Sequence, residues 1–248
     1  MPIALLLVSA LSLFFLVGCG DGEQPDSEVP AADGLQVKLD EKKAQWAAKA
    51  TDETKTIYDD GIAKIAEAGV VESMKQVGEM APDFTLPNAV GEDVSLATLR
   101  KDGPVIVVFY RGAWCPYCNL TLAAWQQELE TIQGLGAQLV TISPQLPDYS
   151  LDSKEKNELK FPVLSDVGNK VSDAFGVTTQ ITLEIIKIWE GKIDLEKHNG
   201  DASAKLPLPA TFLIDTEGKI YFAHAHVDYR VRAEPADVIA KLRELQGK

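Results

Sequence analysis

A run of apolar residues from Val105 to Tyr110 leads, after four residues, into two cysteines three positions apart, Cys115 and Cys118. The β-branched character of the run predicts a strand that is buried on both faces of a sheet. The residues after Cys115 predict the start of a helix, whose unpaired N–H groups and partial positive charge stabilise a thiolate. Two cysteines on this first turn could close a small disulfide ring. In such a strand-to-helix context the pair is a strong indication of redox chemistry.

The remainder of the chain alternates strand and helix patterns. Predicted strands cover residues 138–143, 161–165, 210–215 and 220–224, and predicted helices cover residues 121–132, 151–159, 167–175, 181–189 and 235–245. The stretch 181–189 is ambiguous by periodicity, and we interpret it as a helix. A turn at Gly91-Glu92 separates two further short strands. This order predicts an α/β fold in which helices flank one mixed central sheet.

The first part of the chain predicts a targeting signal rather than folded structure. Residues 2–18 carry no charge and end at small residues around Cys19, and the order from Leu16 to Cys19 resembles the bacterial lipobox. We therefore expect a signal peptide over 1–18, lipidation of Cys19, and a protein anchored by lipid in the cell envelope, on the extracytoplasmic side. The alternatives are a plain signal peptide or an uncleaved anchor in which Cys19 plays no part. A basic segment ahead of the apolar stretch is missing.

Two further segments precede the main domain. Residues 19–34 contain five acids and no base, which predicts a disordered acidic tether. Residues 35–76 show helical spacing, with Leu35, Leu39 and Trp46 in a first helix and Ile57 and Ile62 in a second. We expect this helical extension to pack on the main domain, which covers residues 77–248.

Composition excludes several classes of protein. The formal net charge is −13, so the chain lacks the basic surplus that a nucleic-acid binder needs. Its 46% hydrophobic and 25% charged residues exclude a polytopic membrane protein, which leaves the lipid as the expected membrane contact. Only three cysteines are present, too few for a disulfide-stapled scaffold. If Cys19 carries lipid, an internal disulfide has to join Cys115 to Cys118.

Other uses of the cysteine pair remain open on the sequence. His224 and His226 could complete a Cys₂His₂ zinc site, although the spacing is not that of a zinc ribbon. Covalent haem is excluded because Asn119, not histidine, follows the second cysteine. Two inert buried cysteines are a further alternative. We expect no metal and no cofactor.

The run from Phe109 to Asn119 resembles the peroxiredoxin-like branch of the alkyl hydroperoxide reductase/thiol-specific antioxidant family. Further matching runs lie at residues 81–84, 142–145, 161–166, 209–215 and 227–229, so the resemblance extends over roughly residues 35–248. It implies a thioredoxin-like fold and a thiol-dependent antioxidant enzyme that reduces hydroperoxides. A thioredoxin-like dithiol donor would then recycle the cysteine pair.

The resemblance leaves the identity of the nucleophile open. Peroxiredoxins proper carry Pro-x-x-x-Thr-x-x-Cys and an arginine elsewhere, but neither cysteine keeps that motif and residues 161–190 contain no arginine. In the peroxiredoxin-like branch the second cysteine aligns with the peroxide-attacking one, which favours Cys118. In thioredoxin pairs the first cysteine is usually the exposed nucleophile, which favours Cys115.

Four further residues are candidates for the site. Arg111 could add positive charge near the thiolate, and Trp114 and Tyr117 could line a substrate groove or could simply be packed in the core. In thioredoxin folds a cis proline precedes the third core strand and faces the cysteine pair, and Pro209 suits that position. Two ordinary trans prolines, Pro207 and Pro209, are the alternative.

Three functions compete on these observations. The first is the thiol-dependent peroxidase, which the family resemblance favours. The second is an envelope thiol:disulfide oxidoreductase that acts on protein disulfides, which the missing threonine and arginine favour. The third is an envelope module that keeps the fold without turnover.

Overall fold

The computed structural model describes Met1 and residues 34–247. Apart from Met1 and Gly34, the expected signal peptide, the acidic tether and Cys19 lie outside the described residues. Within the described part of the chain, no helix is both long and apolar enough to cross a membrane.

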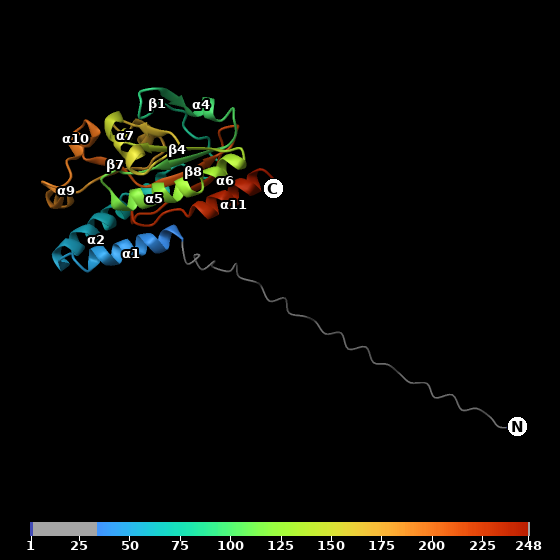
Figure 1. Cartoon of the computed structure of the whole chain (residues 1–248). Coiled ribbons are helices and arrows are strands. Elements are labelled where there is room, and N and C mark those ends of the chain that lie inside the picture. The colour runs from blue at the N-terminus through green and yellow to red at the C-terminus, as the bar shows by residue number, and fades with distance from the viewer. Residues whose placement is uncertain (2–33, 248) are drawn as a thin grey trace.

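A five-stranded mixed sheet forms the centre of the described chain (Figure 1). Its strands, in spatial order, are β5 (Val163–Ser165), β4 (Gln138–Ser143), β3 (Val105–Phe109), β8 (Ala210–Ile214) and β9 (Ile220–Ala225). Strand β3 pairs in parallel with β4 and antiparallel with β8. The strand that leads to the cysteines therefore lies in the middle of the sheet, and all five of its residues are buried.

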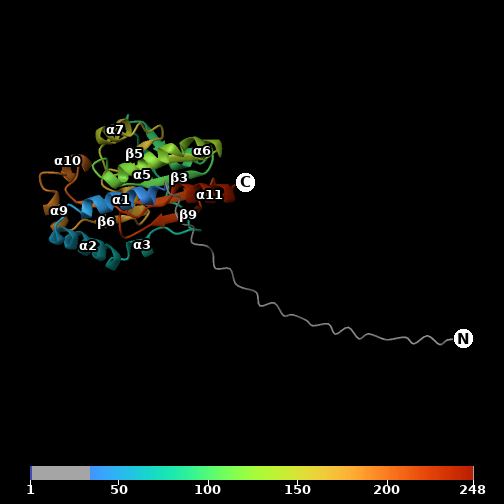
Figure 2. The same ribbon diagram turned by 60° about the horizontal axis from the view of Figure 1, so that its bottom comes forward.

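Helices α5 (Pro116–Gln127), α6 (Leu129–Gly134) and α11 (Pro235–Leu245) cover one face of this sheet (Figures 1 and 2). Ile106 and Val108 of β3 belong to the same apolar cluster as Trp125 of α5 and Leu242 of α11. Both cysteines belong to this cluster as well. The thiols are therefore part of the main hydrophobic core and not of a surface loop.

The opposite face of the sheet is covered by shorter elements. Val107 and Phe109 of β3 pack there with Phe175 and Leu96. The elements on this side are β1 (Thr85–Pro87), β2 (Asp93–Ser95), α4 (Leu96–Leu99) and α8 (Lys170–Ala174), whereas α7 (Pro147–Lys156) packs on the edge strand β5. Strands β1 and β2 form a separate antiparallel pair.

The helical extension begins with α1 (Leu35–Ala47) and continues with α2 (Asp52–Glu67) and the short α3 (Val70–Ser73). Thr51 caps α2 by accepting a hydrogen bond from the N–H of Thr54. Helix α1 packs on α5, and Figure 2 shows it in front of the sheet, next to α5 and α11. Leu35 and Leu39 of α1 are buried in the same cluster as the cysteines.

Between β5 and β8 the chain forms a small group of helices and strands at one end of the molecule. Strands β6 (Thr178–Gln180) and β7 (Lys205–Pro207) pair antiparallel, and α9 (Leu183–Trp189) and α10 (Leu195–Asn199) lie between them in sequence. Helix α2 packs against α9, with Tyr58, Ile185 and Trp189 in one apolar cluster.

The predicted α/β fold, with a mixed central sheet, flanking helices and an N-terminal helical extension, is confirmed. The helix interpretation of 181–189 agrees with α9. The single helix predicted over 121–132 is two helices, because Glu128 adopts φ −93° and ψ 0° and interrupts the regular α-helix between α5 and α6. Strands β6 and β7 and helix α10 were not predicted, since three to five residues carry too little periodicity to detect.

Candidate active site

The cysteine pair lies where β3 passes into α5. Cys115 is the N-cap residue of α5, Pro116 follows it at the first helical position, and Cys118 lies in the first turn. Proline is tolerated there because its missing N–H would have no partner within the helix. Both sulfurs therefore lie at the positive end of the helix dipole, in the arrangement that the spacing predicts.

The loop before Cys115 is fixed by side chains from other elements. The backbone N–H of Ala113 donates to Gln145 Oε1 at 2.7 Å, and Asn119 Nδ2 donates to the carbonyl oxygen of Ala113 at 2.9 Å. Gly112 has φ +148°, and a Cβ at this position would lie 2.5 Å from Trp114 Nε1. Glycine is therefore required both by the backbone angle and by the close approach of the indole.

Both cysteines are free thiols in this structure, and both are buried. Cys115 is 2% exposed and Cys118 is 0% exposed. Leu35 and Leu39 of α1 lie in the same buried cluster, together with Tyr117. The helical extension thus contributes directly to the shell that separates the pair from solvent.

A charged residue that the sequence analysis did not assign to the site touches Cys118. Arg232 Nη2 lies 3.8 Å from Cys118 Sγ, and its Nη1 donates to Thr121 Oγ1 at 3.4 Å. Its Nε donates to the carbonyl oxygen of Tyr229 at 2.6 Å. Arg232 is buried and comes from the stretch between β9 and α11. In the sequence, the run at residues 227–229 together with Arg230 and Arg232 resembles the family's tail, but the resemblance assigned no role to these residues.

The two cysteines ionise very differently. Burial opposes ionisation of Cys118, but the hydrogen bond from Cys115, the charge of Arg232 and the backbone N–H of Arg111 outweigh it and hold the pKa of Cys118 well below its usual value. Burial, followed by the hydrogen bond with Cys118 and the charge on that residue, raises the pKa of Cys115 well above its usual value. The arrangement therefore favours a Cys118 thiolate that accepts a hydrogen bond from a neutral Cys115 thiol.

Arg111 lies in a cage of aromatic rings beside the pair. The centre of its guanidinium lies 4.3 Å from the ring of Tyr229, 5.1 Å from that of Trp114 and 5.3 Å from that of Trp189. Such cation–π contacts stabilise a buried guanidinium that has lost its water. Arg111 acts on the cysteines as a nearby charge that favours their ionised forms.

The aromatic candidates also lie at the pair. Tyr117 is buried and stacks edge to face on Tyr229, with ring centroids 5.7 Å apart. Trp114 packs on Trp189 at 5.3 Å and is part-exposed. The structure thus places both next to the thiols, as part of the wall around them.

The expectation that Pro209 follows a cis peptide bond was wrong. All peptide bonds of the described residues are trans. Pro209 joins β7 directly to β8, and the N–H of Leu208 donates to the carbonyl oxygen of Val177 at 2.7 Å, so this stretch runs straight from one strand into the next. Pro209 is buried and lines a small cavity together with Arg111 and Tyr229.

The histidines proposed as zinc ligands are not gathered around the cysteines. His226 Nδ1 accepts the backbone N–H of Asp228 at 3.0 Å. Burial lowers the pKa of His224, which keeps this side chain neutral. Among the residues that the structure describes, no three His, Cys, Asp or Glu side chains are placed to hold a metal ion.

The profile of the family described as AhpC/TSA matches residues 77–223, which is more than half of the chain. The chain belongs to the AhpC/TSA family. A putative peroxiredoxin of Mycobacterium tuberculosis is 32% identical over 166 residues, which cover 67% of this chain and 91% of that protein. Peroxiredoxin Bcp of Escherichia coli K12 is 28% identical over 169 residues, which cover 68% and 96% of the two chains.

Solved structures of AhpC/TSA-type proteins share the thioredoxin-like fold. Peroxidoxin BcpB of Mycobacterium tuberculosis superposes with a TM-score of 0.54 at 24% identity, over 68% of this chain and 97% of its own. A peroxiredoxin-like protein of Aquifex aeolicus superposes with a TM-score of 0.55 at 18% identity, over 69% of this chain and 88% of its own. The sequence relatives identify this AhpC/TSA member as a peroxiredoxin-like oxidoreductase, a thiol-dependent peroxidase.

The AhpC/TSA match does not include every residue of the site. Both cysteines and Arg111 lie within residues 77–223, whereas Arg232 and the helices α1 and α2 lie outside that range. The part of the site that touches Cys118 from the C-terminal side, and the helices that cover it, therefore lie outside the matched residues.

Proposed function

We propose that Cys118 is the thiolate that attacks hydroperoxides and that Cys115 resolves the product. The observation that carries this assignment is the contact of Arg232 with Cys118 Sγ at 3.8 Å. It places a fixed positive charge on the second cysteine of the pair, and a thiolate is the nucleophilic form of cysteine. The lowered pKa of Cys118 and the raised pKa of Cys115 support the same assignment.

The chemistry balances with the two cysteines alone. The Cys118 thiolate attacks the terminal oxygen of the hydroperoxide, the O–O bond breaks, and the alkoxide or hydroxide leaves with the electron pair and takes up a proton. Cys118 is then a sulfenic acid, oxidised by two electrons. The Cys115 thiol attacks this sulfur, and a disulfide forms as water leaves. The helix start brings the two residues close enough for this second step.

A dithiol donor completes the cycle by reducing the Cys115–Cys118 disulfide, and we propose a thioredoxin-like protein in that role. Thiol–disulfide exchange requires one donor sulfur to reach one sulfur of the pair. Cys115 lies at the N-cap of α5, nearest to the loop, and is the sulfur that we propose the donor attacks.

The alternative, exchange with protein disulfides, has less support. That activity needs an ionised first cysteine as the nucleophile, whereas burial raises the pKa of Cys115. A hydroperoxide is a small molecule, and its reduction requires only a thiolate at Cys118. We therefore place hydroperoxide reduction ahead of protein disulfide exchange.

We further propose that the protein is anchored to the cell envelope by lipid on Cys19, which the order Leu16-Val17-Gly18-Cys19 supports. Cys19 lies outside the described residues. Labelling of cells with a radioactive fatty acid checks this proposal: the wild-type protein should take up label and Cys19→Ser should not. Equal labelling of the two proteins would rule the anchor out.

The test of the peroxidase assignment is rapid-mixing kinetics of the reduced protein with hydrogen peroxide and with an organic hydroperoxide. Wild type, Cys115→Ser and Cys118→Ser are compared, with sulfenic acid followed by mass. We expect Cys115→Ser to form a lasting sulfenic acid and Cys118→Ser to react no faster than a free thiol. A reaction that is lost in Cys115→Ser and kept in Cys118→Ser would reverse the assignment.

A further inference from the structure

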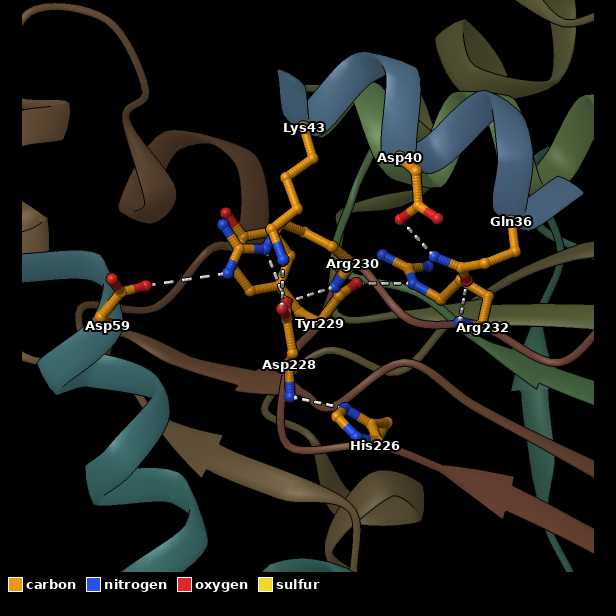
Figure 3. Close-up of polar contacts among 9 residues, drawn as sticks. All are labelled: Gln36, Asp40, Lys43, Asp59, His226, Asp228, Tyr229, Arg230 and Arg232. Atoms are coloured by element: carbon orange, nitrogen blue, oxygen red, sulfur yellow. Dashed lines mark hydrogen bonds and ion pairs between the residues drawn. The ribbon is translucent and has the colours of Figure 1, made fainter. Parts of the chain in front are cut away.

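The residues between β9 and α11 supply Arg232 without the support of a helix or strand. We call residues 226–234 the arginine segment, and its positions are set by turns and side-chain contacts. Figure 3 shows the segment with Arg230 and Arg232 pointing among side chains from the helical extension. Gln36 and Lys43 come from α1, and Asp59 comes from α2.

Helix α1 and the arginine segment hold each other at two points. Gln36 Oε1 accepts the backbone N–H of Arg232 at 3.3 Å. In the other direction, the carboxylate of Glu234 accepts the N–H of Leu35 at 2.9 Å and that of Gln36 at 2.6 Å. Gly34, which precedes the helix, has no side chain to cap it, so Glu234 satisfies the first free N–H groups of α1 from a distant part of the chain.

Gln36 is itself held in place. Its Nε2 donates to Asp40 Oδ1 at 2.9 Å, one helical turn further on. This contact fixes the amide so that its oxygen faces Arg232. The chain of contacts therefore runs from Asp40 through Gln36 to the backbone of Arg232, and from the Arg232 guanidinium to Cys118.

Contacts around Arg230 add a weaker second attachment. Arg230 Nε donates to Asp228 Oδ1 at 2.7 Å, and Lys43 Nζ lies 3.5 Å from Asp228 Oδ2. Asp59 lies 3.9 Å from Arg230 but its side chain is 72% exposed, so this pair contributes little. The contacts made by Gln36 and Glu234 are therefore the ones that hold the segment on α1.

We propose that α1 is a positioning element of the thiol site, in which Gln36 and Glu234 hold the arginine segment so that the Arg232 guanidinium lies on Cys118. The inference rests on the proposed role of Cys118. None of these three residues lies within residues 77–223, so the match to the family does not contain this device. Gln36 and Glu234 are positioning residues, because they act through Arg232 and do not touch the sulfur.

The groups that face Cys118 determine in which direction its ionisation should change. They are Cys115 on the same helix, Arg111 from the loop after β3, and Arg232 from the arginine segment. Displacement of Arg232 removes positive charge from the sulfur, so less Cys118 is ionised at a given pH. The change is visible in a titration of the thiolate and does not depend on peroxidase turnover.

The experiment is a pH titration of thiolate ultraviolet absorbance in the reduced, full-length chain with Cys19→Ser, so that only two thiols titrate. Gln36→Met keeps the length of the side chain and removes its polar atoms. We expect the midpoint of the first ionisation to rise by about half a pH unit, which lowers the thiolate fraction about threefold below the midpoint. Gln45→Met, the same change at an exposed position of α1, is the matched control and should leave the midpoint unchanged.

A second variant distinguishes the positioning of Arg232 from a direct effect of charge on the thiolate. It also tests the proposal if Gln36→Met does not fold. Glu234→Ala removes a negative charge from the neighbourhood of the thiolate, so a direct charge effect lowers the midpoint. Displacement of Arg232 from Cys118 raises the midpoint. We expect a rise, and a fall would overturn the proposal.

The role of Arg232 is tested by repeating Gln36→Met in an Arg232→Gln background. If Gln36 acts through Arg232, the second substitution adds no further shift. The same shift in both backgrounds, or no shift from Gln36→Met in the otherwise unaltered chain, overturns the proposal. Failure of the peroxidase assignment would instead appear as slow peroxide reaction in a chain whose titration behaves as expected.

Discussion

Two arginine side chains lie near one sulfur, and their contacts are different. Arg232 reaches Cys118 Sγ with a terminal nitrogen, whereas the Arg111 guanidinium lies over the rings of Trp114 and Tyr229. We therefore expect Arg232→Gln to slow reaction with hydroperoxide about tenfold or more, and Arg111→Gln to slow it less. Rapid-mixing rates at one fixed pH measure the difference.

The matched control for these substitutions is Arg243→Gln, an exposed arginine on α11. Its rate should equal that of the wild type. A larger loss in Arg111→Gln than in Arg232→Gln would mean that the aromatic cage, and not the contact with the sulfur, activates the thiol.

Gly112 shapes the loop that presents the pair. Its φ is +148°, and a Cβ would lie within 3.0 Å of two atoms of the Trp114 ring. Gly112→Ala should lower the free energy of unfolding by about 1–3 kcal/mol, because the substitution combines backbone strain with a displaced indole. Urea denaturation measures the loss.

Gly191→Ala is the control for Gly112→Ala. Gly191 also has a positive φ, +70°, but no atom lies within 4 Å of the position of its Cβ. Its loss of stability should therefore reflect the backbone alone and be the smaller of the two. Equal losses would show that the contact with Trp114 is unimportant.

At the scale of elements, helix α2 is fastened to α9 by a buried polar contact. Trp189 Nε1 donates to Tyr58 Oη at 2.8 Å, and both residues are buried. Tyr58→Phe leaves the indole N–H buried without a partner, which should lower the free energy of unfolding by about 1–3 kcal/mol. Thermal or urea unfolding measures the change.

The control is Tyr221→Phe, which removes a hydroxyl from a part-exposed tyrosine of β9. It should leave stability nearly unchanged. If Tyr58→Phe has as small an effect, the contact between α2 and α9 is maintained by apolar packing alone.

The elements also differ in how far the sequence predicts them. Strand β3, the loop and the start of α5 follow from local patterns: a β-branched run, Gly112, and Pro116 after an N-cap. Both cysteines, Arg111, Trp114 and Tyr117 were found because they lie in that one stretch. These patterns concern neighbours in the chain, and they identify the chemistry of the site.

The rest of the site depends on contacts between distant residues. Arg232 meets Cys118 across 114 positions, and Gln36 meets Arg232 across 196. The arginine segment has neither helical nor strand periodicity, so only its resemblance to the family's tail pointed to it. The cis form expected at Pro209 was wrong, and strand β7, which precedes it, pairs with β6, a pairing that the sequence did not reveal.

For the molecule as a whole, the state of the thiols is coupled to stability. The pKa of Cys118 is lower in the folded chain than in an unfolded one. The folded reduced protein therefore gains stability from this group above the ordinary thiol pKa, and it loses that contribution as the pH falls through the lowered folded value. The raised pKa of Cys115 lowers the stability of the folded protein, and it does so only at pH values above the ordinary thiol pKa.

We expect the melting temperature of the reduced protein, relative to the oxidised one, to fall as the pH is lowered from neutral into the acid range. The disulfide has no ionisable thiol, so the oxidised form is the internal reference. Calorimetry on both forms across that range measures the difference. Reduced Cys118→Ser, which lacks the thiolate, should show no such trend when it is compared at each pH with the oxidised wild type, and a trend of equal size there would contradict the linkage.

The position of Arg232 also has a consequence in time. The cysteines are synthesised long before the residue that activates one of them, and Glu234, which holds the start of α1, follows two positions after that arginine. A growing chain therefore carries both thiols and Arg111 before Arg232 has been made. The contact between Arg232 and Cys118 can form only once the last part of the chain has been made.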